Sequence, residues 1–101
     1  MEIYATDNQD GTLVTIDKTK LIGVESEAFQ NVVKNSLEKG SKNISIDLSK
    51  VEYVSSWGIG LLIQAYTSCH NRNVNFSIRG VNSQVMNVLN QLKLTTLFNI
   101  S

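Results

Sequence analysis

Two adjacent serines, Ser55 and Ser56, are the residues whose type and setting point most clearly to chemistry. They follow a short apolar strand and a loop, and they open an apolar stretch with helical character. With Ser56 at the N-cap of that helix, its hydroxyl lies beside the unpaired N–H groups of the first turn, where a second protein can reach it. A phosphate added there would meet the positive end of the helix dipole. Serine is also a preferred N-cap residue, so capping alone explains Ser56 without any further function.

The composition is that of an ordinary globular domain without a charge surplus. The chain has 101 residues, enough for one hydrophobic core and too few for two, so we expect a single domain over residues 1–101. Lys and Arg together number 9, as do Asp and Glu, and the formal charge is zero. Because nucleic-acid-binding domains usually carry a basic surplus, this balance argues against nucleic acid as a partner.

Export and membrane insertion find no support in the residues. The single cysteine, Cys69, cannot form an internal disulfide and fits a reducing compartment. Acidic residues at positions 2, 7 and 10 interrupt the apolar run that a signal peptide needs. No window approaches the ~18 apolar residues that span a bilayer. We therefore expect a cytoplasmic protein without membrane insertion.

Other candidate chemical groups are weak. Cys69 and His70 are neighbours, but a metal site needs more ligands, and a catalytic pair must converge from a suitable fold. Asp and Glu residues are scattered singly, which provides no pair for acid–base hydrolysis. A glycine-rich phosphate loop is absent, and Gly58 with Gly60 is too little to predict nucleotide binding. The sequence therefore predicts no enzyme activity, no cofactor and no metal.

Several segments have the pattern of β-strands. Residues 2–8 and 12–17 are β-rich and flank Asp10-Gly11, a strong turn signal, so we expect an opening hairpin. A short extended segment is expected at Leu21-Ile22 in the connection that follows. Residues 44–48 then alternate between apolar and polar, as a strand with one buried face does.

The first predicted helix covers residues 26–39. Helical spacing places four apolar side chains on one face: Phe29, Val32, Val33 and Leu37. Ser26 is the expected N-cap, and Lys39-Gly40 is a typical helix stop.

The second predicted helix runs from about Trp57 to His70. Its apolar side chains cover a wide arc, as in a helix packed on a sheet: Ile59, Leu61, Leu62, Ile63, Ala65 and Tyr66. Gly58 and Gly60 are poor helix formers, each costing roughly 1 kcal/mol against alanine. Near a helix start, we expect them to permit close approach of another backbone segment.

A strand and a third helix complete the chain. Residues 74–78 alternate again as a strand. Asn82 or Ser83 caps the third helix, whose expected buried face is formed by Val85, Leu89 and Leu92. Residues 97–100 are apolar and are predicted as a last short strand. The resulting order β-β-α-β-α-β-α-β favours parallel pairing with right-handed crossovers. We predict an α/β sandwich with a mixed sheet of four or five strands.

Three consecutive segments resemble the STAS domain family (sulfate transporter and anti-sigma factor antagonist): Asp47-Leu48-Ser49, Val51-Glu52-Tyr53-Val54 and Ser55-Ser56-Trp57-Gly58-Ile59-Gly60. The usual family pattern is Asp-Leu-Ser, a Val-x-Phe/Tyr-Ile stretch and then Asp-Ser-Ser-Gly-Leu-Gly. The resemblance covers nearly the whole chain, and single-domain anti-sigma factor antagonists are the relatives most similar in size. It implies a STAS-like α/β fold.

The resemblance also implies a function. In that family, the serine directly after the motif aspartate is phosphorylated by a partner kinase that is also an anti-sigma factor, and a phosphatase removes the phosphate. Only the unphosphorylated form captures its partner. The resemblance therefore implies a non-enzymatic regulator of transcription by partner switching, with Ser56 as the phosphoacceptor. The partner-binding residues that it implies are Ser55, Ser56, Trp57, Gly58 and Gly60.

This chain departs from the family pattern at defined positions. Ser55 stands where the family usually has aspartate, and Trp57 stands where it usually has a second serine. Residues 20–23 replace the frequent Gly-x-Leu-Asp run of the family. Ser55 is an alternative phosphoacceptor, and Trp57 is either a core residue or an exposed interface anchor.

Two other interpretations stay open. The chain also resembles STAS regulators of biofilm or polysaccharide loci, and the STAS subunit of a lipid-transport complex, which would be a constitutive scaffold without phosphorylation. A different class is a small enzyme or nucleotide-binding protein with a cleft near Ser55 and Ser56, although the chain lacks a suitable base and phosphate loop.

Overall fold

The structure is a computed structural model that describes residues 2–100. Its elements follow one another as β1 (Ile3–Asn8), β2 (Gly11–Ile16), β3 (Lys20–Leu21), α1 (Ser26–Glu38), β4 (Asn43–Asp47), β5 (Tyr53–Val54), α2 (Ser56–Asn71), β6 (Asn75–Arg79) and α3 (Ser83–Gln91). Within this part of the chain, no helix combines the length and apolar character needed to cross a membrane.

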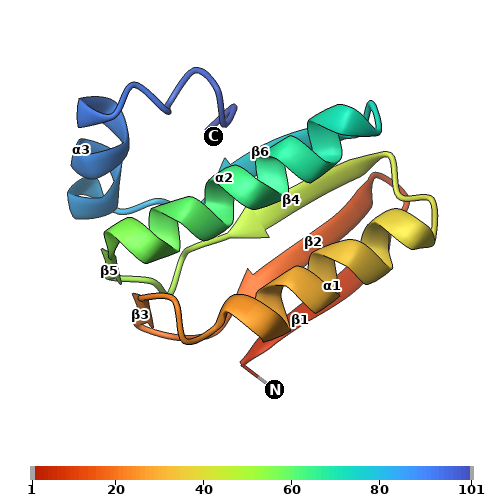
Figure 1. Ribbon diagram of the computed structural model, residues 1–101, viewed down its shortest axis with the longest axis horizontal. Coiled ribbons are helices and arrows are strands. Elements are labelled where there is room, and N and C mark those ends of the chain that lie inside the picture. The colour runs from red at the N-terminus through yellow and green to blue at the C-terminus, as the bar shows by residue number, and fades with distance from the viewer. Residues whose placement is uncertain (1, 101) are drawn as a thin grey trace.

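The main sheet is mixed, with strands in the order β1-β2-β4-β6 (Figure 1). β1 and β2 form an antiparallel hairpin that closes at the pair Asn8 and Gly11, as the Asp-Gly turn signal predicts. The backbone N–H of Asp10 donates to the side-chain oxygen of Asn8 at 2.8 Å and fixes this turn. β2, β4 and β6 are parallel, so the connections between them must cross the sheet. Those crossovers carry α1 and α2.

Both crossover helices lie on one face of the sheet, α1 over β1 and β2, and α2 beside it over β6 (Figure 1). Side chains alternate along each strand, so Val14, Ile46 and Ile78 are fully buried beneath the helices. The opposite face is polar, and the hydroxyls of Ser45 and Ser77 share a hydrogen bond of 2.7 Å between β4 and β6. The predicted α/β sandwich with a mixed sheet is confirmed.

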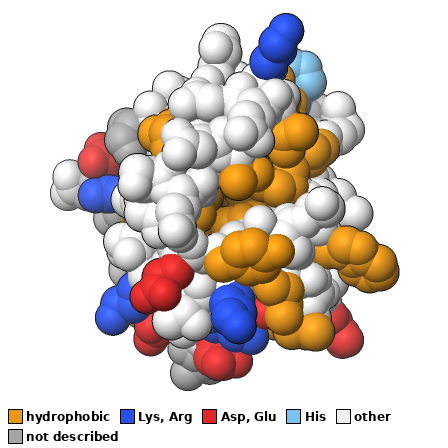
Figure 2. Space-filling view, turned by 90° about the vertical axis from the view of Figure 1, so that its left-hand side faces the viewer, with side chains coloured by type: hydrophobic (Ala, Val, Ile, Leu, Met, Phe, Trp, Pro, Cys, Tyr) orange, Lys and Arg blue, Asp and Glu red, His pale blue; other side chains and the backbone are white. Residues whose placement is uncertain are grey.

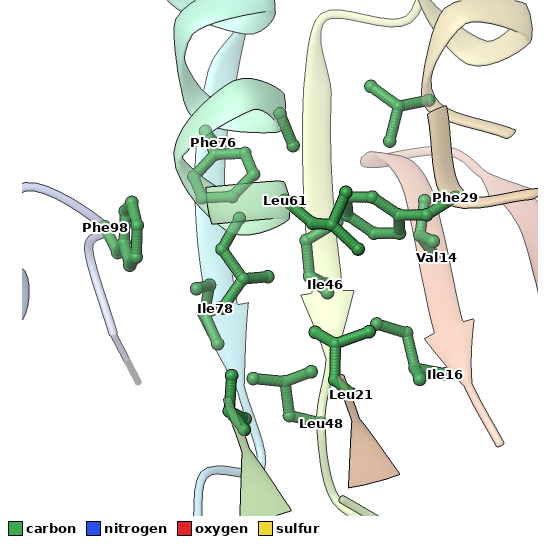
Figure 3. Close-up of a cluster of buried hydrophobic side chains, with 14 of the residues drawn as sticks. Val14, Ile16, Leu21, Phe29, Ile46, Leu48, Leu61, Phe76, Ile78 and Phe98 are labelled. Atoms are coloured by element: carbon green, nitrogen blue, oxygen red, sulfur yellow. The ribbon is translucent and has the colours of Figure 1, made fainter. Parts of the chain in front are cut away.

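The hydrophobic core fills the space between the helices and the sheet (Figure 3). Phe29 of α1 and Leu61 of α2 enter it from the helix layer. Phe98 comes from the segment after α3, and its ring centroid lies 5.7 Å from that of Phe76 in β6. Ile63, one of the apolar side chains that the sequence places along α2, is 38% exposed at the groove between α1 and α2. Through Phe98, the C-terminal segment is part of the core.

Local groups set the ends of α1 and α3. Asn82 caps α3 as predicted, because its side-chain oxygen accepts from the N–H of Val85 at 2.8 Å. Gly40 follows α1 with φ of +88°, the left-handed conformation expected at a helix stop. The prediction of Ser26 as N-cap is wrong, since Ser26 is the first helical residue and Glu25 occupies the cap position without a capping bond. The Glu25 carboxylate is instead engaged by the preceding loop.

The C-terminal part departs from the prediction in two places. Leu92 is 53% exposed, because α3 ends at Gln91 and the chain turns there. Residues 97–100 do not form a strand, since only Ile100 pairs with β6, through one parallel bridge to Ile78. The apolar residues there serve the core through Phe98 rather than extending the sheet.

A separate small sheet, β3 paired in parallel with β5, stands beside the start of α2. The extended segment predicted at Leu21-Ile22 is therefore displaced by one residue, to Lys20–Leu21. β5 has no counterpart in the prediction, because a strand of two residues is too short to show alternation. This small sheet positions the candidate site.

Candidate functional site

Ser55 is the last extended residue before α2, with φ of -81° and ψ of 174°. Its hydroxyl oxygen accepts from the N–H of Gly58 at 3.1 Å, which is the N-cap hydrogen bond. Its own N–H donates to the carbonyl of Leu21 in β3 at 3.0 Å. Ser55 therefore both caps α2 and ties the helix start to the small sheet.

Ser56 is the first residue of α2, so the prediction that it is the N-cap is wrong by one position. Both serines are good capping residues, and the extended backbone of Ser55, fixed by β3, decides between them. The Ser56 side chain is exposed. Within residues 2–100, its hydroxyl has no hydrogen-bond partner. The structure thus separates capping, done by Ser55, from a free hydroxyl at Ser56.

Gly58 lets α2 approach the small sheet, as its position near the helix start predicts. A Cβ at Gly58 would collide with the carbonyl oxygen of Leu21 and would lie 2.9 Å from a methyl carbon of Val54. Gly60 differs, because a Cβ there would meet nothing within 4 Å. The expectation of close backbone approach is therefore confirmed for Gly58 and wrong for Gly60.

Trp57 is an exposed residue, so the prediction that it belongs to the core is excluded. Its side chain is 78% exposed and crosses Gly23, where a Cβ would lie 2.9 Å from the Cβ of Trp57. Ile22 and Val24 flank Gly23. Tyr53 is the first residue of β5, the strand that directly precedes Ser55. These exposed apolar side chains, which we call the Trp57 patch, are Ile22, Val24, Tyr53 and Trp57.

Figure 2 shows that apolar side chains gather on the end of the molecule that holds β3, β5 and α3. The exposed fractions within the Trp57 patch are large, 78% for Val24 and 55% for Tyr53. Single exposed apolar residues are normal on a protein surface, whereas a cluster of them marks an interaction surface. Tryptophan and tyrosine are also enriched among the residues that dominate binding energies.

Glu25 holds the loop that contains Ile22 and Val24 of this patch. The sequence pattern did not single out Glu25. Its carboxylate accepts from the N–H groups of Ile22 and Gly23, both at 3.0 Å, and from the ammonium of Lys18 at 2.9 Å. Burial raises the pKa of Glu25, but the bonds from Lys18 and the loop N–H groups outweigh burial and leave the pKa below its ordinary value. The hydrogen bond that Lys18 donates to Glu25 raises the pKa of Lys18. A lone acidic residue shortly before a predicted helix is too common a pattern to reveal this role.

The start of α2 retains its positive character. No acidic residue lies in its first turn. Ser55 satisfies the N–H of Gly58, while within residues 2–100 the N–H groups of Ser56 and Trp57 have no acceptor. Free N–H groups at a helix N-terminus carry partial positive charge and favour an anion nearby. The electrostatics at Ser56 therefore favour added negative charge on its hydroxyl.

Cys69 and His70 do not come together as a reactive pair. Cys69 is buried, and burial raises the pKa of its thiol to about 11. His70 is exposed and stacks on Tyr66, with ring centroids 5.6 Å apart. Among residues 2–100, no group of three His, Cys, Asp or Glu side chains is arranged to hold a metal ion. The groove between α1 and α2, of about 640 Å³, is lined by neither Ser55 nor Ser56.

Comparison with known families decides the classification. Residues 3–101 match the sequence profile of the STAS domain. The chain belongs to the STAS domain family. A proposed anti-sigma factor antagonist of Thermotoga maritima is 24% identical and superimposes with a TM-score of 0.81, over 97% of this STAS domain and 84% of that chain. An anti-sigma factor antagonist of Mycobacterium paratuberculosis is 17% identical, with a TM-score of 0.83 over 97% of this chain and 82% of that one.

The STAS domain is also similar to the anti-sigma factor antagonist SpoIIAA in its unphosphorylated form. That match has 10% identity and a TM-score of 0.70, over 87% of this chain and 81% of SpoIIAA. Identities this low establish a common fold alone. No curated protein sequence matches this STAS domain. The family membership confirms the resemblance carried by residues 47–60.

Proposed function

We propose that this STAS domain is a phosphorylation-controlled binding module, with Ser56 as the phosphoacceptor and the start of α2 as the docking surface. The observation that carries the proposal is the division of labour between the two serines. Ser55 makes the capping bond, so the exposed hydroxyl of Ser56 is not needed for the helix. A kinase can therefore modify Ser56 without removing a structural interaction.

A phosphate on Ser56 is compatible with the fold. It would stand at the first helical position, beside the unpaired N–H groups of Ser56 and Trp57. Acidic groups near a helix N-terminus stabilise a helix by about 0.3–1 kcal/mol at exposed positions. Phosphorylation is thus expected to change the surface of a folded domain rather than to unfold it.

The same phosphate would oppose docking of a protein on the Trp57 patch. Ser56 and Trp57 both lie in the first turn of α2, so a partner that docks on the Trp57 side chain brings its surface close to the hydroxyl of Ser56. A phosphoserine carries a charge of about -1.5 to -2. Removing such a charge from water without a paired cation has a penalty of several kcal/mol. A penalty of ~3 kcal/mol already weakens an affinity by more than a hundredfold.

Family membership supports a protein partner of the anti-sigma factor type, with a serine kinase that phosphorylates Ser56 and a phosphatase that removes the phosphate. One structural neighbour, SpoIIAA, is described in its unphosphorylated form, which is consistent with reversible phosphorylation in a protein of this fold. The regulator itself requires no catalytic residue and no cofactor in this scheme. Whether the partner binds depends only on whether the docking surface carries the phosphate on Ser56.

The first test is to locate the modification. The tagged chain is isolated from its source cells and its peptides are analysed by mass spectrometry. We expect a phosphate on Ser56 of the wild-type chain, loss of the phosphate in Ser56→Ala, and retention in Ser55→Ala. A phosphate that persists in Ser56→Ala, or that maps to Ser55, would contradict the site assignment.

The second test is to compare capture of partners. Unmodified protein, Ser56→Ala and protein carrying phosphoserine at position 56 are used as baits in the same lysate. A protein retained by the first two and released by the third supports the switch. Equal capture by all three forms would instead identify a constitutive scaffold. Trp57→Ala, which keeps Ser56, is expected to reduce capture as strongly as phosphorylation does.

A further inference from the structure

The two edges of the main sheet are β1 and β6, and they differ in which segments lie beside them. At the β6 edge, the C-terminal segment runs alongside, with Ile100 bridged to Ile78 and the N–H of Ile78 donating to the Asn99 carbonyl. β1 has β2 on one side, and residues 2–100 place no strand on the other (Figure 1). We propose that this free edge of β1 pairs with β1 of a second copy of the chain, which joins the two main sheets into one.

The backbone groups available for this pairing can be assigned from the hairpin. The N–H of Asp17 donates to the carbonyl of Glu2, so these two residues form a hydrogen-bonded pair. In an antiparallel ladder such pairs alternate, and Tyr4 and Thr6 therefore direct their backbone groups toward β2. Ile3, Ala5 and Asp7 direct theirs outward. Among residues 2–100, no group pairs with the outward N–H and C=O groups of these three residues.

β1 lacks the features that protect sheet edges in most proteins. Natural edges are blunted by proline, by lysine, by bulges or by very short strands. β1 is six residues long, Ile-Tyr-Ala-Thr-Asp-Asn, and pairs with β2 residue by residue without a bulge. Its charged residue, Asp7, lies near the end of the strand and is engaged by Thr12 and Lys39. The edge therefore remains open for strand addition.

A two-fold axis through Ala5 gives a self-complementary register. Ala5 then faces Ala5 of the second copy, Ile3 faces Asp7, and Tyr4 faces Thr6. No two like charges stand opposite each other, and every outward N–H of one copy meets an outward C=O of the other. An antiparallel pair of identical strands is the isologous contact that closes a dimer and leaves no further edge.

The flank of α1 above this edge suits a second copy as well. Lys39 reaches Asp7 of β1 at 3.7 Å, which places its side of α1 over the edge. At 100° per residue, Ala28, Val32 and Asn35 share that side with Lys39. Ala28 is exposed, Val32 is half-buried, and neither Ala28, Val32 nor Asn35 carries a charge. Lys39, the charged residue on this side, is paired with Asp7, so the flank of α1 offers a second copy mainly uncharged side chains.

This dimer would leave Ser56 and Trp57 uncovered, because β1 and the start of α2 lie at different sides of the molecule (Figure 1). Each dimer would present two copies of the Ser56 surface. The inference does not rest on phosphorylation, so the two proposals can fail separately.

The dimer is tested by sedimentation of the full chain over concentrations from about 10 µM to about 1 mM. We expect the mass to rise from 11.2 kDa toward twice that value as concentration increases. A mass that stays at 11.2 kDa over the whole range would overturn the proposal.

A charge swap at the proposed axis tests the register. Ala5→Lys and Ala5→Glu each place like charges opposite each other and are expected to weaken self-association about tenfold, while an equimolar mixture of the two recovers it. Ala5→Gln, similar in size but neutral, is the control and should associate as wild type does. Thermal unfolding of each variant at low concentration checks that the fold is intact. Dimers of Ala5→Lys as strong as wild type, or no recovery in the mixture, would overturn the β1 interface.

Discussion

Replacing Gly58 by alanine is expected to destabilise the domain, whereas the same change at Gly60 is expected to stabilise it. Alanine is favoured over glycine inside a helix by about 1 kcal/mol, so propensity alone predicts a gain at both positions. The two sites differ in what surrounds them. A methyl group at Gly58 would collide with the Leu21 carbonyl oxygen, while a methyl group at Gly60 would meet nothing within 4 Å.

The magnitude at Gly58 follows from what must move. The Leu21 carbonyl accepts the N–H of Ser55 at 3.0 Å, and a methyl carbon of Val54 lies 2.9 Å from the added carbon. Relieving the collision means separating α2 from β3, which weakens that hydrogen bond by about 1 kcal/mol and adds overpacking strain of about 1–3 kcal/mol. After the gain in helix propensity, we expect a net loss of about 1–3 kcal/mol for Gly58→Ala. Gly60→Ala should gain up to about 1 kcal/mol.

Urea denaturation of both variants and the wild type measures the difference directly. The denaturation midpoints should move in opposite directions while the slopes stay the same. A Gly58→Ala variant as stable as Gly60→Ala would refute the close approach of α2 to β3.

Other changes test neighbouring parts of the structure. Ser55→Ala should lower the free energy of unfolding by about 1 kcal/mol, and Ser56→Ala should change it by less than about 0.5 kcal/mol, both measured by urea denaturation. Glu25→Gln should cost about 1–2 kcal/mol at pH 7. Because folding lowers the pKa of Glu25, its contribution is present above its ordinary value of 4.5 and is lost as pH falls through the folded value. The gap between wild type and Glu25→Gln should therefore narrow toward pH 3, and a gap independent of pH would refute the role of the carboxylate. Phe98→Ala removes a fully buried ring and should cost about 3–5 kcal/mol in the same assay, so a loss below about 1 kcal/mol would show that the C-terminal segment is not part of the core.

The main elements of the fold are predictable because they depend on side-chain periodicity. Alternation identifies β4 and β6, and helical spacing identifies the face of α1 that carries Phe29 and Val33. The Asp-Gly signal identifies the hairpin. The apolar run at 97–100 shows neither alternation nor helical spacing, and an apolar segment without such a pattern can join the core without joining the sheet. Phe98 does so.

The candidate site is less predictable because tertiary contacts decide its details. Ser55 and Ser56 are chemically identical, and only the hydrogen bond from Ser55 to β3 determines which of them caps α2. The loop against which Trp57 lies is held by the Glu25 carboxylate, which accepts from the N–H groups of Ile22 and Gly23. Neither contact leaves a local pattern in the sequence. Family resemblance points to the candidate site, and the structure is needed to show which serine caps α2 and which is exposed.

The affinity of the captured partner for two forms of the domain tests the central claim most directly. Titration calorimetry would compare unmodified protein with protein carrying phosphoserine at position 56. The account predicts a dissociation constant at least about a hundredfold larger for the phosphorylated form, with an unchanged fold by circular dichroism. Equal dissociation constants for the two forms would contradict it.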